Sequence, residues 1–79
     1  PESLHEEFAG LSRSIRRLLN SDEPDLYRRL LIELDRVMLK EVLLHFRGNQ
    51  VHASQRLGMS RTTLRTKLAN LGLDQQSID

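Results

Sequence analysis

The chain has 79 residues, no cysteine and a formal net charge of +1. A chain of this length forms one small domain, and the lack of cysteine excludes disulfides and thiolate metal sites. No segment is long and apolar enough to span a bilayer, and no signal-peptide pattern is present. We therefore expect a soluble intracellular protein.

The small net charge hides an uneven distribution. Residues 1–46 carry seven Arg or Lys and nine Asp or Glu, whereas residues 47–79 carry five and two, so the net charges are −2 and +3. Between Val42 and Leu73 there is no acidic residue. A basic unit of this kind is typical of a polyanion-binding surface, although five charges alone fit a solvated basic surface equally well.

An apolar stripe predicts a first helix over residues 3–20. Its members recur mostly at steps of three or four, and they are Leu4, Phe8, Leu11, Ile15, Leu18 and Leu19. Gly10 lies inside this stripe and weakens a helix by about 1 kcal/mol relative to alanine. The polar stretch from Asn20 to Pro24 is expected to end the helix.

A second, long helix is expected to start near Pro24 and to run to Phe46, because proline suits the first helical turn and no glycine or proline interrupts residues 25–46. Its apolar residues are too many for one stripe. One face comprises Leu30, Leu31, Leu34, Val37, Met38 and Val42, and a flank comprises Ile32, Leu39, Leu43 and Phe46.

A helix that is apolar on two sides must be covered on two sides. We therefore expect a second subunit to complete the core, with the first two helices of each chain forming a two-fold, intertwined four-helix bundle. A wholly intramolecular core is the alternative. The residues expected in the dimer interface are Phe8, Leu11, Ile15, Leu31, Leu34, Met38, Leu39 and Val42.

Glycines divide the rest of the chain into two short helices. Three of them are expected to end helices in the left-handed conformation, namely Gly48, Gly58 and Gly72. Asn49 is expected to cap a third helix over residues 50–57, and Ser60 a fourth over residues 61–70. No strand pattern is present, so the predicted fold class is all-α with four helices.

Two short helices joined by a tight glycine turn form a helix-turn-helix, whose second helix enters the DNA major groove. Ala53 and Ser54 are small enough to let the two helices cross closely. Leu64 and Leu68, one turn apart, are expected to anchor the second helix inward. The remaining surface of that helix is then polar and cationic.

The side chains expected to reach DNA from this last helix are Arg61, Thr62, Thr63, Arg65, Thr66 and Lys67. Arginine can bind the O6 and N7 atoms of guanine bidentately, and threonine can offer a hydroxyl or a methyl group. Lysine can neutralise a phosphate as a point charge. Thr63 has a simpler alternative, in which its hydroxyl bonds only the helix backbone.

The start of the third helix is expected to hold the DNA backbone. Free amides at a helix N-terminus bind phosphate, so Asn49 and Gln50 are candidates, with His52 one turn further on. Asn49 is interpreted as both a cap and a contact. Ser60, by contrast, is interpreted as a cap rather than a base reader.

The run from Asp25 to Leu73 closely resembles the Fis-type DNA-binding domain. The most specific pieces are RGNQ at residues 47–50, LGMSR at residues 57–61 and TLRTKL at residues 63–68. That domain occurs in the nucleoid protein Fis and at the C-terminus of NtrC-like activators of sigma-54 RNA polymerase. The resemblance implies a dimer of intertwined four-helix subunits that binds a degenerate palindrome and bends it. It assigns the main DNA contacts to Arg61, Thr63 and Arg65, with Asn49 and Gln50 at the backbone.

We interpret residues 1–79 as one Fis-like domain, with dimerisation helices at 1–46, a helix-turn-helix at 47–73 and a polar tail at 74–79. Because the chain begins at Pro1 with an acidic first helix, we expect a domain severed from a longer NtrC-like bacterial activator, of the kind found in two-component systems. Such an activator binds palindromic enhancer sites as a homodimer and reaches sigma-54 RNA polymerase through other domains. The alternatives are a stand-alone Fis-like DNA-bending protein and a purely structural dimerisation module.

No catalytic residue, metal site or cofactor is expected. His5, His45 and His52 lack metal-ligand spacing, and no paired carboxylate lies beside them. No glycine-rich phosphate loop is present, so this chain is not expected to hydrolyse ATP. The expected location is the bacterial cytoplasm, in association with the nucleoid and without a membrane partner.

Overall fold

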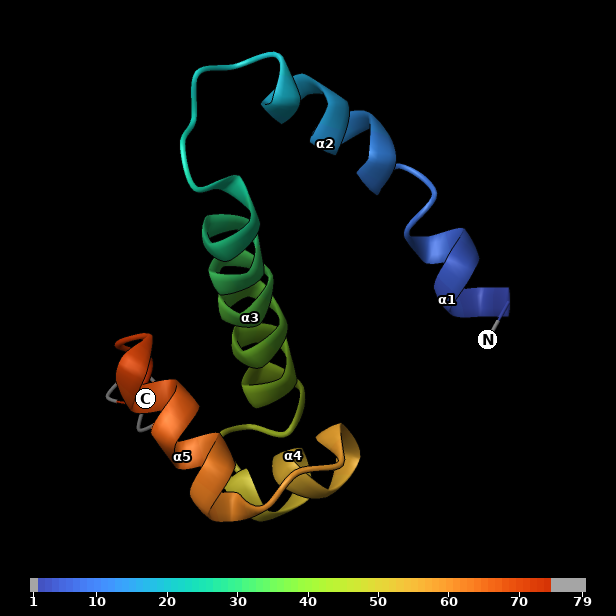
Figure 1. The fold of residues 1–79 in the computed structure, drawn as a ribbon. Helices are drawn as coiled ribbons and strands as arrows, with labels where there is room; N and C mark the ends of the chain where they lie inside the picture. Colours follow the sequence, from blue (N-terminus) through green and yellow to red (C-terminus); the bar gives the residue numbers. More distant parts are fainter. Residues whose placement is uncertain (1, 75–79) are drawn as a thin grey trace.

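The structure, a computed structural model, describes residues 2–74. Its elements are α1 (Glu2–Glu7), α2 (Leu11–Leu19), α3 (Leu26–His45), α4 (Gln50–Leu57) and α5 (Arg61–Asn70) (Figure 1). The described range contains no strand, so the predicted all-α class is confirmed. No helix within this range is long and apolar enough to cross a membrane. Apart from Asp74, the predicted polar tail lies outside the described residues.

The predicted first helix is interrupted. Where the apolar stripe predicted one helix over residues 3–20, the structure contains α1 and α2, separated by a turn at residues 8–10. The amide of Ala9 donates to the carbonyl of Glu6 at 3.1 Å, and this bond closes a turn that is tighter than a turn of α-helix. Gly10 directly precedes α2, and its low helix propensity accounts for the position of the break.

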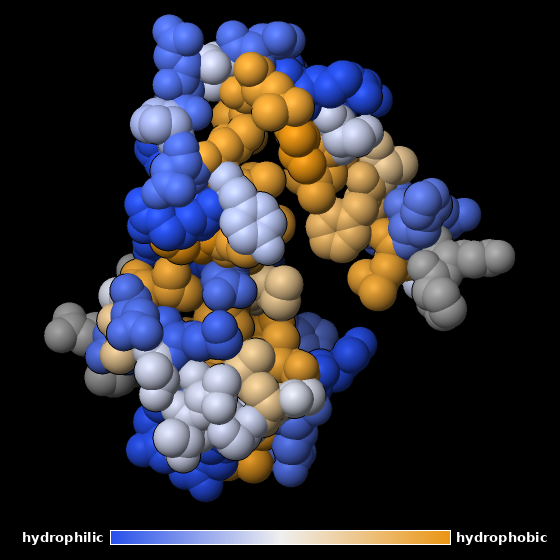
Figure 2. Space-filling view, in the orientation of Figure 1, coloured by the Kyte–Doolittle hydropathy of each residue, from blue (hydrophilic) through white to orange (hydrophobic). Residues whose placement is uncertain are grey.

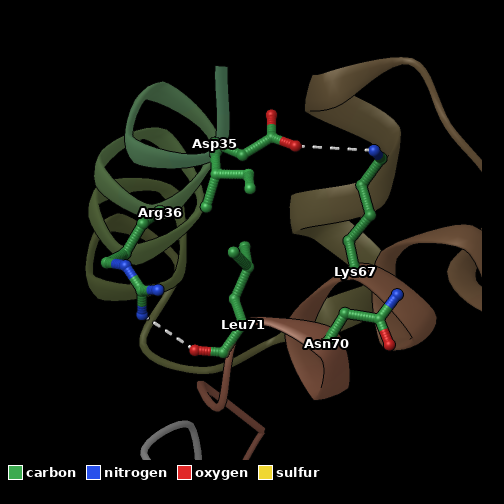
Figure 3. Close-up of a pocket in the computed structure, with 6 residues that line it drawn as sticks. Asp35, Arg36, Lys67, Asn70 and Leu71 are labelled. Atoms are coloured by element: carbon green, nitrogen blue, oxygen red, sulfur yellow. Dashed lines mark hydrogen bonds and ion pairs between the residues drawn. The ribbon is translucent and has the colours of Figure 1, made fainter. Parts of the chain in front are cut away.

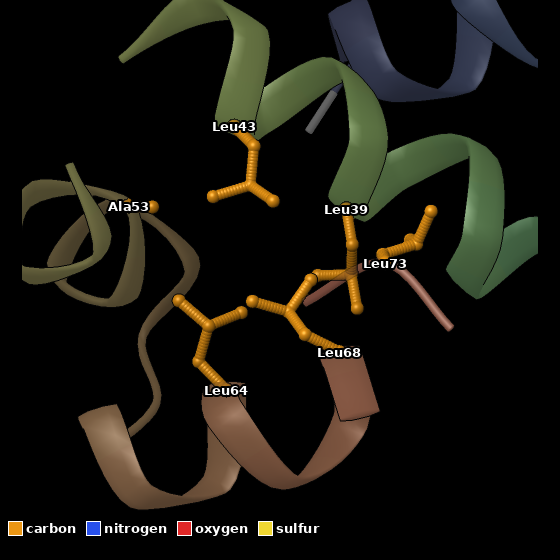
Figure 4. Close-up of a cluster of buried hydrophobic side chains, with 6 residues drawn as sticks. All are labelled: Leu39, Leu43, Ala53, Leu64, Leu68 and Leu73. Carbon is orange, nitrogen blue, oxygen red and sulfur yellow. The ribbon is translucent and has the colours of Figure 1, made fainter. Parts of the chain in front are cut away.

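The core lies between α3 and the two C-terminal helices. Its buried members are Leu39, Leu43, Ala53, Leu64, Leu68 and Leu73 (Figure 4). Around them pack the partly buried Val42, Phe46, Leu57, Met59 and Leu71. The flank of α3 predicted from the sequence therefore faces α4 and α5.

The prediction for Leu39 is wrong. Leu39 was expected in the dimer interface, but its residue exposure is only 2% within the single chain. It contacts the core beneath α5 and is not available to a second subunit. Sequence periodicity identified Leu39 as apolar and inward-facing but not which element covers it, because that depends on the packing of segments distant along the chain.

The other predicted face of α3 is open in the single chain. Leu31 and Met38 are 44% and 46% exposed, and Phe8 on the N-terminal segment is 48% exposed. Leu11, Ile15, Leu34 and Val42 are only partly buried. Figure 2 shows apolar side chains on the facing sides of the α1–α2 segment and of α3, with a hollow between them.

The helix ends largely follow the predicted glycine positions. The φ angles of Gly48, Gly58 and Gly72 are 80°, 76° and 73°. α3 begins at Leu26, two residues after the predicted start, because Asp25 adopts φ 56° and ψ 41°. Arg47 also has a positive φ of 54°, which the sequence did not predict.

Gly58→Ala should lower the free energy of unfolding by about 1–2 kcal/mol, because an L residue with a Cβ is strained in the left-handed region. A Cβ at this position would meet no atom within 4 Å, so the backbone alone is responsible for the loss. Urea denaturation at fixed protein concentration measures it. Gly10→Ala is the matched control, since Gly10 has φ −80° and an equally open surrounding. Because alanine adopts that φ without strain but caps a helix less well than glycine, this substitution should change the free energy of unfolding by less than about 1 kcal/mol; equal losses in the two variants would contradict the prediction.

Candidate nucleic-acid interface

Side-chain caps set the start of both short helices. The Asn49 side chain accepts a hydrogen bond from the amide of His52 at 3.1 Å. The Ser60 hydroxyl accepts one from the amide of Thr63 at 3.0 Å. Both predicted caps are therefore confirmed, and the bounds of α4 and α5 are those predicted from the sequence.

Small and fully buried side chains hold α4 against α5. Ala53 is 0% exposed and Ser54 is 3% exposed, and the Ser54 hydroxyl donates to the carbonyl of Val51 at 2.9 Å. Leu64 and Leu68 of α5 are both 0% exposed. The amide of Met59 donates to the carbonyl of Ser54 at 3.0 Å, which closes the turn between the helices. This arrangement is the predicted helix-turn-helix.

The side of α5 opposite these leucines is polar and open to solvent. Its exposed members are Arg61, Thr62, Thr63, Arg65, Thr66, Ala69 and Asn70. Within residues 2–74, neither arginine of this group forms an ion pair. Five of the six residues predicted to reach DNA from this helix therefore share one accessible surface, which we call the outer surface of α5.

Lys67 lies on the border of this surface and is half-buried. Its Nζ lies 3.6 Å from Oδ2 of Asp35 on α3 (Figure 3). The sequence predicted a phosphate contact for Lys67 and gave no sign of this partner, because the two residues are 32 positions apart along the chain. In the free chain the ammonium is therefore turned toward α3.

The start of α4 adds further polar groups. Asn49 and His52 are exposed, whereas Gln50 is half-buried. Because the His52 amide donates to Asn49, only the ring of His52 remains to contact a phosphate. That ring lies edge-on to Phe46, with centroids 6.3 Å apart, and Phe46 also contacts the ring of His45 at 4.7 Å. The sequence did not predict this ring cluster.

The sequence profile of the family described as "Bacterial regulatory protein, Fis family" matches residues 30–71. The chain belongs to the Fis family. The matched stretch contains most of α3 and all of α4 and α5, so it comprises the helix-turn-helix and the helix that supports it.

Three curated relatives illustrate the similarity of this Fis-family domain. "DNA-binding protein Fis" of Glaesserella parasuis serovar 5 (strain SH0165) is 42% identical over 59 residues, which are 75% of this chain and 60% of that protein. "Putative Fis-like DNA-binding protein" of Xylella fastidiosa (strain Temecula1 / ATCC 700964) is 46% identical over 61 residues, 77% of this chain and 68% of that protein. "DNA-binding protein Fis" of Proteus mirabilis (strain HI4320) is 38% identical over 65 residues, with coverages of 82% and 66%. The chain thus spans less than two thirds of the Glaesserella protein. No solved structure matches the chain described here.

The Fis family is described as one of bacterial regulatory proteins. The sequence predicted a protein that is not an enzyme, and the family assignment supports that prediction. Among residues 2–74, no group of three His, Asp or Glu side chains is arranged to hold a metal ion.

Ser60 also orients Thr63 on the outer surface. The Ser60 hydroxyl donates to Oγ1 of Thr63 at 2.9 Å, in addition to accepting from the Thr63 amide. The Thr63 side chain is therefore hydrogen-bonded to the side chain of Ser60, and either hydroxyl can be the donor of that bond. The Thr63 hydroxyl is therefore held by the N-cap residue of its own helix while its side chain stays exposed on the outer surface of α5.

Ser60→Ala should lower the free energy of unfolding by about 1 kcal/mol, because the amide of Thr63 loses its cap. Chemical denaturation monitored by circular dichroism at 222 nm, the α-helix band, measures the change. Ser60→Asn keeps a side-chain acceptor at the cap and should remain close to wild type. A loss of the same size in both variants would show that the cap is not the cause.

Proposed function

We propose that the chain is the sequence-specific DNA-binding and dimerisation domain of an NtrC-like bacterial transcriptional activator. The observation that carries the proposal is the outer surface of α5, which is cationic, rich in hydroxyl groups and free of acidic residues. Leu64 and Leu68 hold that surface outward, since both are completely buried on the opposite side. A helix presented in this way fits the DNA major groove.

In the proposed complex, α5 lies in the major groove and the start of α4 holds the backbone. Arg61 and Arg65 are long enough to bind guanine edges bidentately. The hydroxyls of Thr62, Thr63 and Thr66 reach phosphates or bases, and Asn49, Gln50 and the His52 ring contact the backbone beside them.

The open face of α3 and the apolar stripe of the N-terminal helices support the proposed dimerisation. The proposed interface now comprises Phe8, Leu11, Ile15, Leu31, Leu34, Met38 and Val42, without Leu39. Large apolar side chains that stay exposed in a single small domain favour association. A two-fold dimer would present two copies of α5 to a palindromic site, whose half-site spacing reports the separation of the two helices.

Two biological contexts use this architecture. In an NtrC-like activator, the domain binds enhancer sites while other domains contact sigma-54 RNA polymerase. The relatives described above are named Fis and Fis-like proteins, which favours a stand-alone DNA-bending regulator as the second candidate. Both contexts imply a cytoplasmic protein bound to the nucleoid, and both require the same surface of α5.

Arg65→Ala should weaken binding to a selected site by about 1–3 kcal/mol and relax the base preference at one position, because a bidentate contact is lost. A duplex obtained by selection from a random pool, titrated by fluorescence anisotropy, measures this loss. Arg13→Ala removes the same side chain from an exposed position on α2 and should change affinity by less than about 0.5 kcal/mol.

Two outcomes would contradict this assignment. Equal losses for Arg65→Ala on selected and scrambled duplexes would remove its base-reading role. Failure of the wild-type chain to bind any duplex at low salt would leave a purely structural dimerisation module as the function. A dimerisation module alone has no use for the cationic outer surface of α5.

Met38→Asp should weaken the dimer by at least about 3 kcal/mol, because a two-fold interface would bury the unpaired charge twice. Sedimentation velocity over a protein dilution series measures the shift from dimer to monomer. Leu44→Asp is the matched control, since Leu44 is 65% exposed and lies on another side of the same helix. A wild-type chain that sediments as a folded monomer at micromolar concentration would contradict the proposed dimer.

A further inference from the structure

The helix-turn-helix contains no acidic residue, but an acidic side chain from α3 lies against it. Residues 42–73 contain no Asp or Glu, yet Asp35 of α3 brings a carboxylate against α5. Of the three cationic side chains on α5, Lys67 is the one that has an ion-pair partner within residues 2–74. The inference rests on this difference, because Arg61 and Arg65 have no ion-pair partner within the same residues.

Lys67 and Asp35 face each other across a groove between α3 and the end of α5. The groove is lined by Ile32, Asp35, Arg36, Lys67, Asn70 and Leu71. The two charged side chains remain accessible, with 41% of Lys67 and 45% of Asp35 exposed to solvent. Figure 3 shows the Lys67 side chain extending away from the end of the groove at which Leu71 lies, with its ammonium opposite the Asp35 carboxylate.

A second polar contact holds the two walls of this groove together. Nη1 of Arg36 donates to the carbonyl of Leu71 at 2.9 Å, just beyond the last residue of α5. That carbonyl belongs to the negative end of the helix dipole, where a cation is favoured. Arg36 therefore fixes the end of α5 against α3, and the separation between Asp35 and Lys67 is set by the packing of the two helices.

We propose that Asp35 is a positioning residue that competes with DNA phosphate for the ammonium of Lys67 and thereby limits the affinity of the domain for DNA. This inference rests on the proposed DNA-binding function. In the free protein Asp35 holds Lys67 toward α3. When a duplex approaches, the phosphate must displace the Asp35 carboxylate before it can pair with Lys67.

The competition is closely balanced because both partners of the pair are accessible to water. An exposed ion pair shifts an equilibrium by no more than about fivefold, so a phosphate can displace Asp35 at a modest cost in affinity. Phosphate contacts carry no direct sequence information. Asp35 should therefore reduce affinity for every duplex by the same factor and leave the preference between sites unchanged.

Asp35→Asn, Lys67→Ala and the double variant of the full chain test the inference, together with Glu41→Gln as a control. Glu41 is exposed on the same helix and forms no ion pair within the described range, so its substitution removes the same formal charge without touching Lys67. Each protein is titrated by fluorescence anisotropy with a selected duplex and with a scrambled duplex of equal length. Thermal unfolding of each variant verifies that it is folded.

Asp35→Asn should bind both duplexes about two- to fivefold more tightly than wild type, and more tightly than Glu41→Gln. In the Lys67→Ala background this gain should vanish, because Asp35 acts through that lysine. A gain that persists without Lys67, or equal gains for Asp35→Asn and Glu41→Gln, would overturn the inference. Either result leaves DNA binding itself intact, whereas a wild-type chain that binds no duplex would overturn the proposed function instead.

Discussion

The packing of two leucines of α5 onto two leucines of α3 is the constraint on which the rest of the structure depends. α4 and α5 contain 8 and 10 residues, and helices of that length are only marginally stable in water by themselves. Leu64 and Leu68 bury completely against the cluster that contains Leu39 and Leu43. The same contact fixes which side of α5 faces outward, so stability and the candidate interface have one physical origin.

α3 is apolar on two sides, and only one of them is covered in the single chain. One side supports the helix-turn-helix, and the other, which includes Leu31 and Met38, is open in the single chain. With 20 residues the helix is about 30 Å long and acts as a rigid strut between these two sides. In the proposed dimer, the arrangement of the two α3 helices would therefore determine the distance between the two copies of α5.

The sequence was most informative where structure is decided locally. Asn49 and Ser60 cap their helices through backbone amides three residues away, so both helix starts could be predicted from residue type and spacing. The sequence did not predict the break between α1 and α2, because the apolar side chains keep the helical spacing of 3.6 residues across it. That spacing gives no information on whether the backbone hydrogen bonds of the helix are continuous. Leu39 and Asp35 were beyond the reach of periodicity, since their surroundings are set by contacts between α3 and α5.

The Asp35 carboxylate also bears on how strongly a small basic domain binds DNA of any sequence. Attraction to phosphate strengthens binding to every site in a genome, so each additional free cation raises occupancy of wrong sites as well as right ones. Discrimination comes from base contacts, for which Arg61 and Arg65 are exposed and unpaired within the described residues. Pairing Lys67 with a carboxylate from the supporting helix reduces the non-selective attraction and leaves those two arginines unaffected. The distribution of acids in space, rather than along the chain, therefore sets how strongly this surface attracts a polyanion.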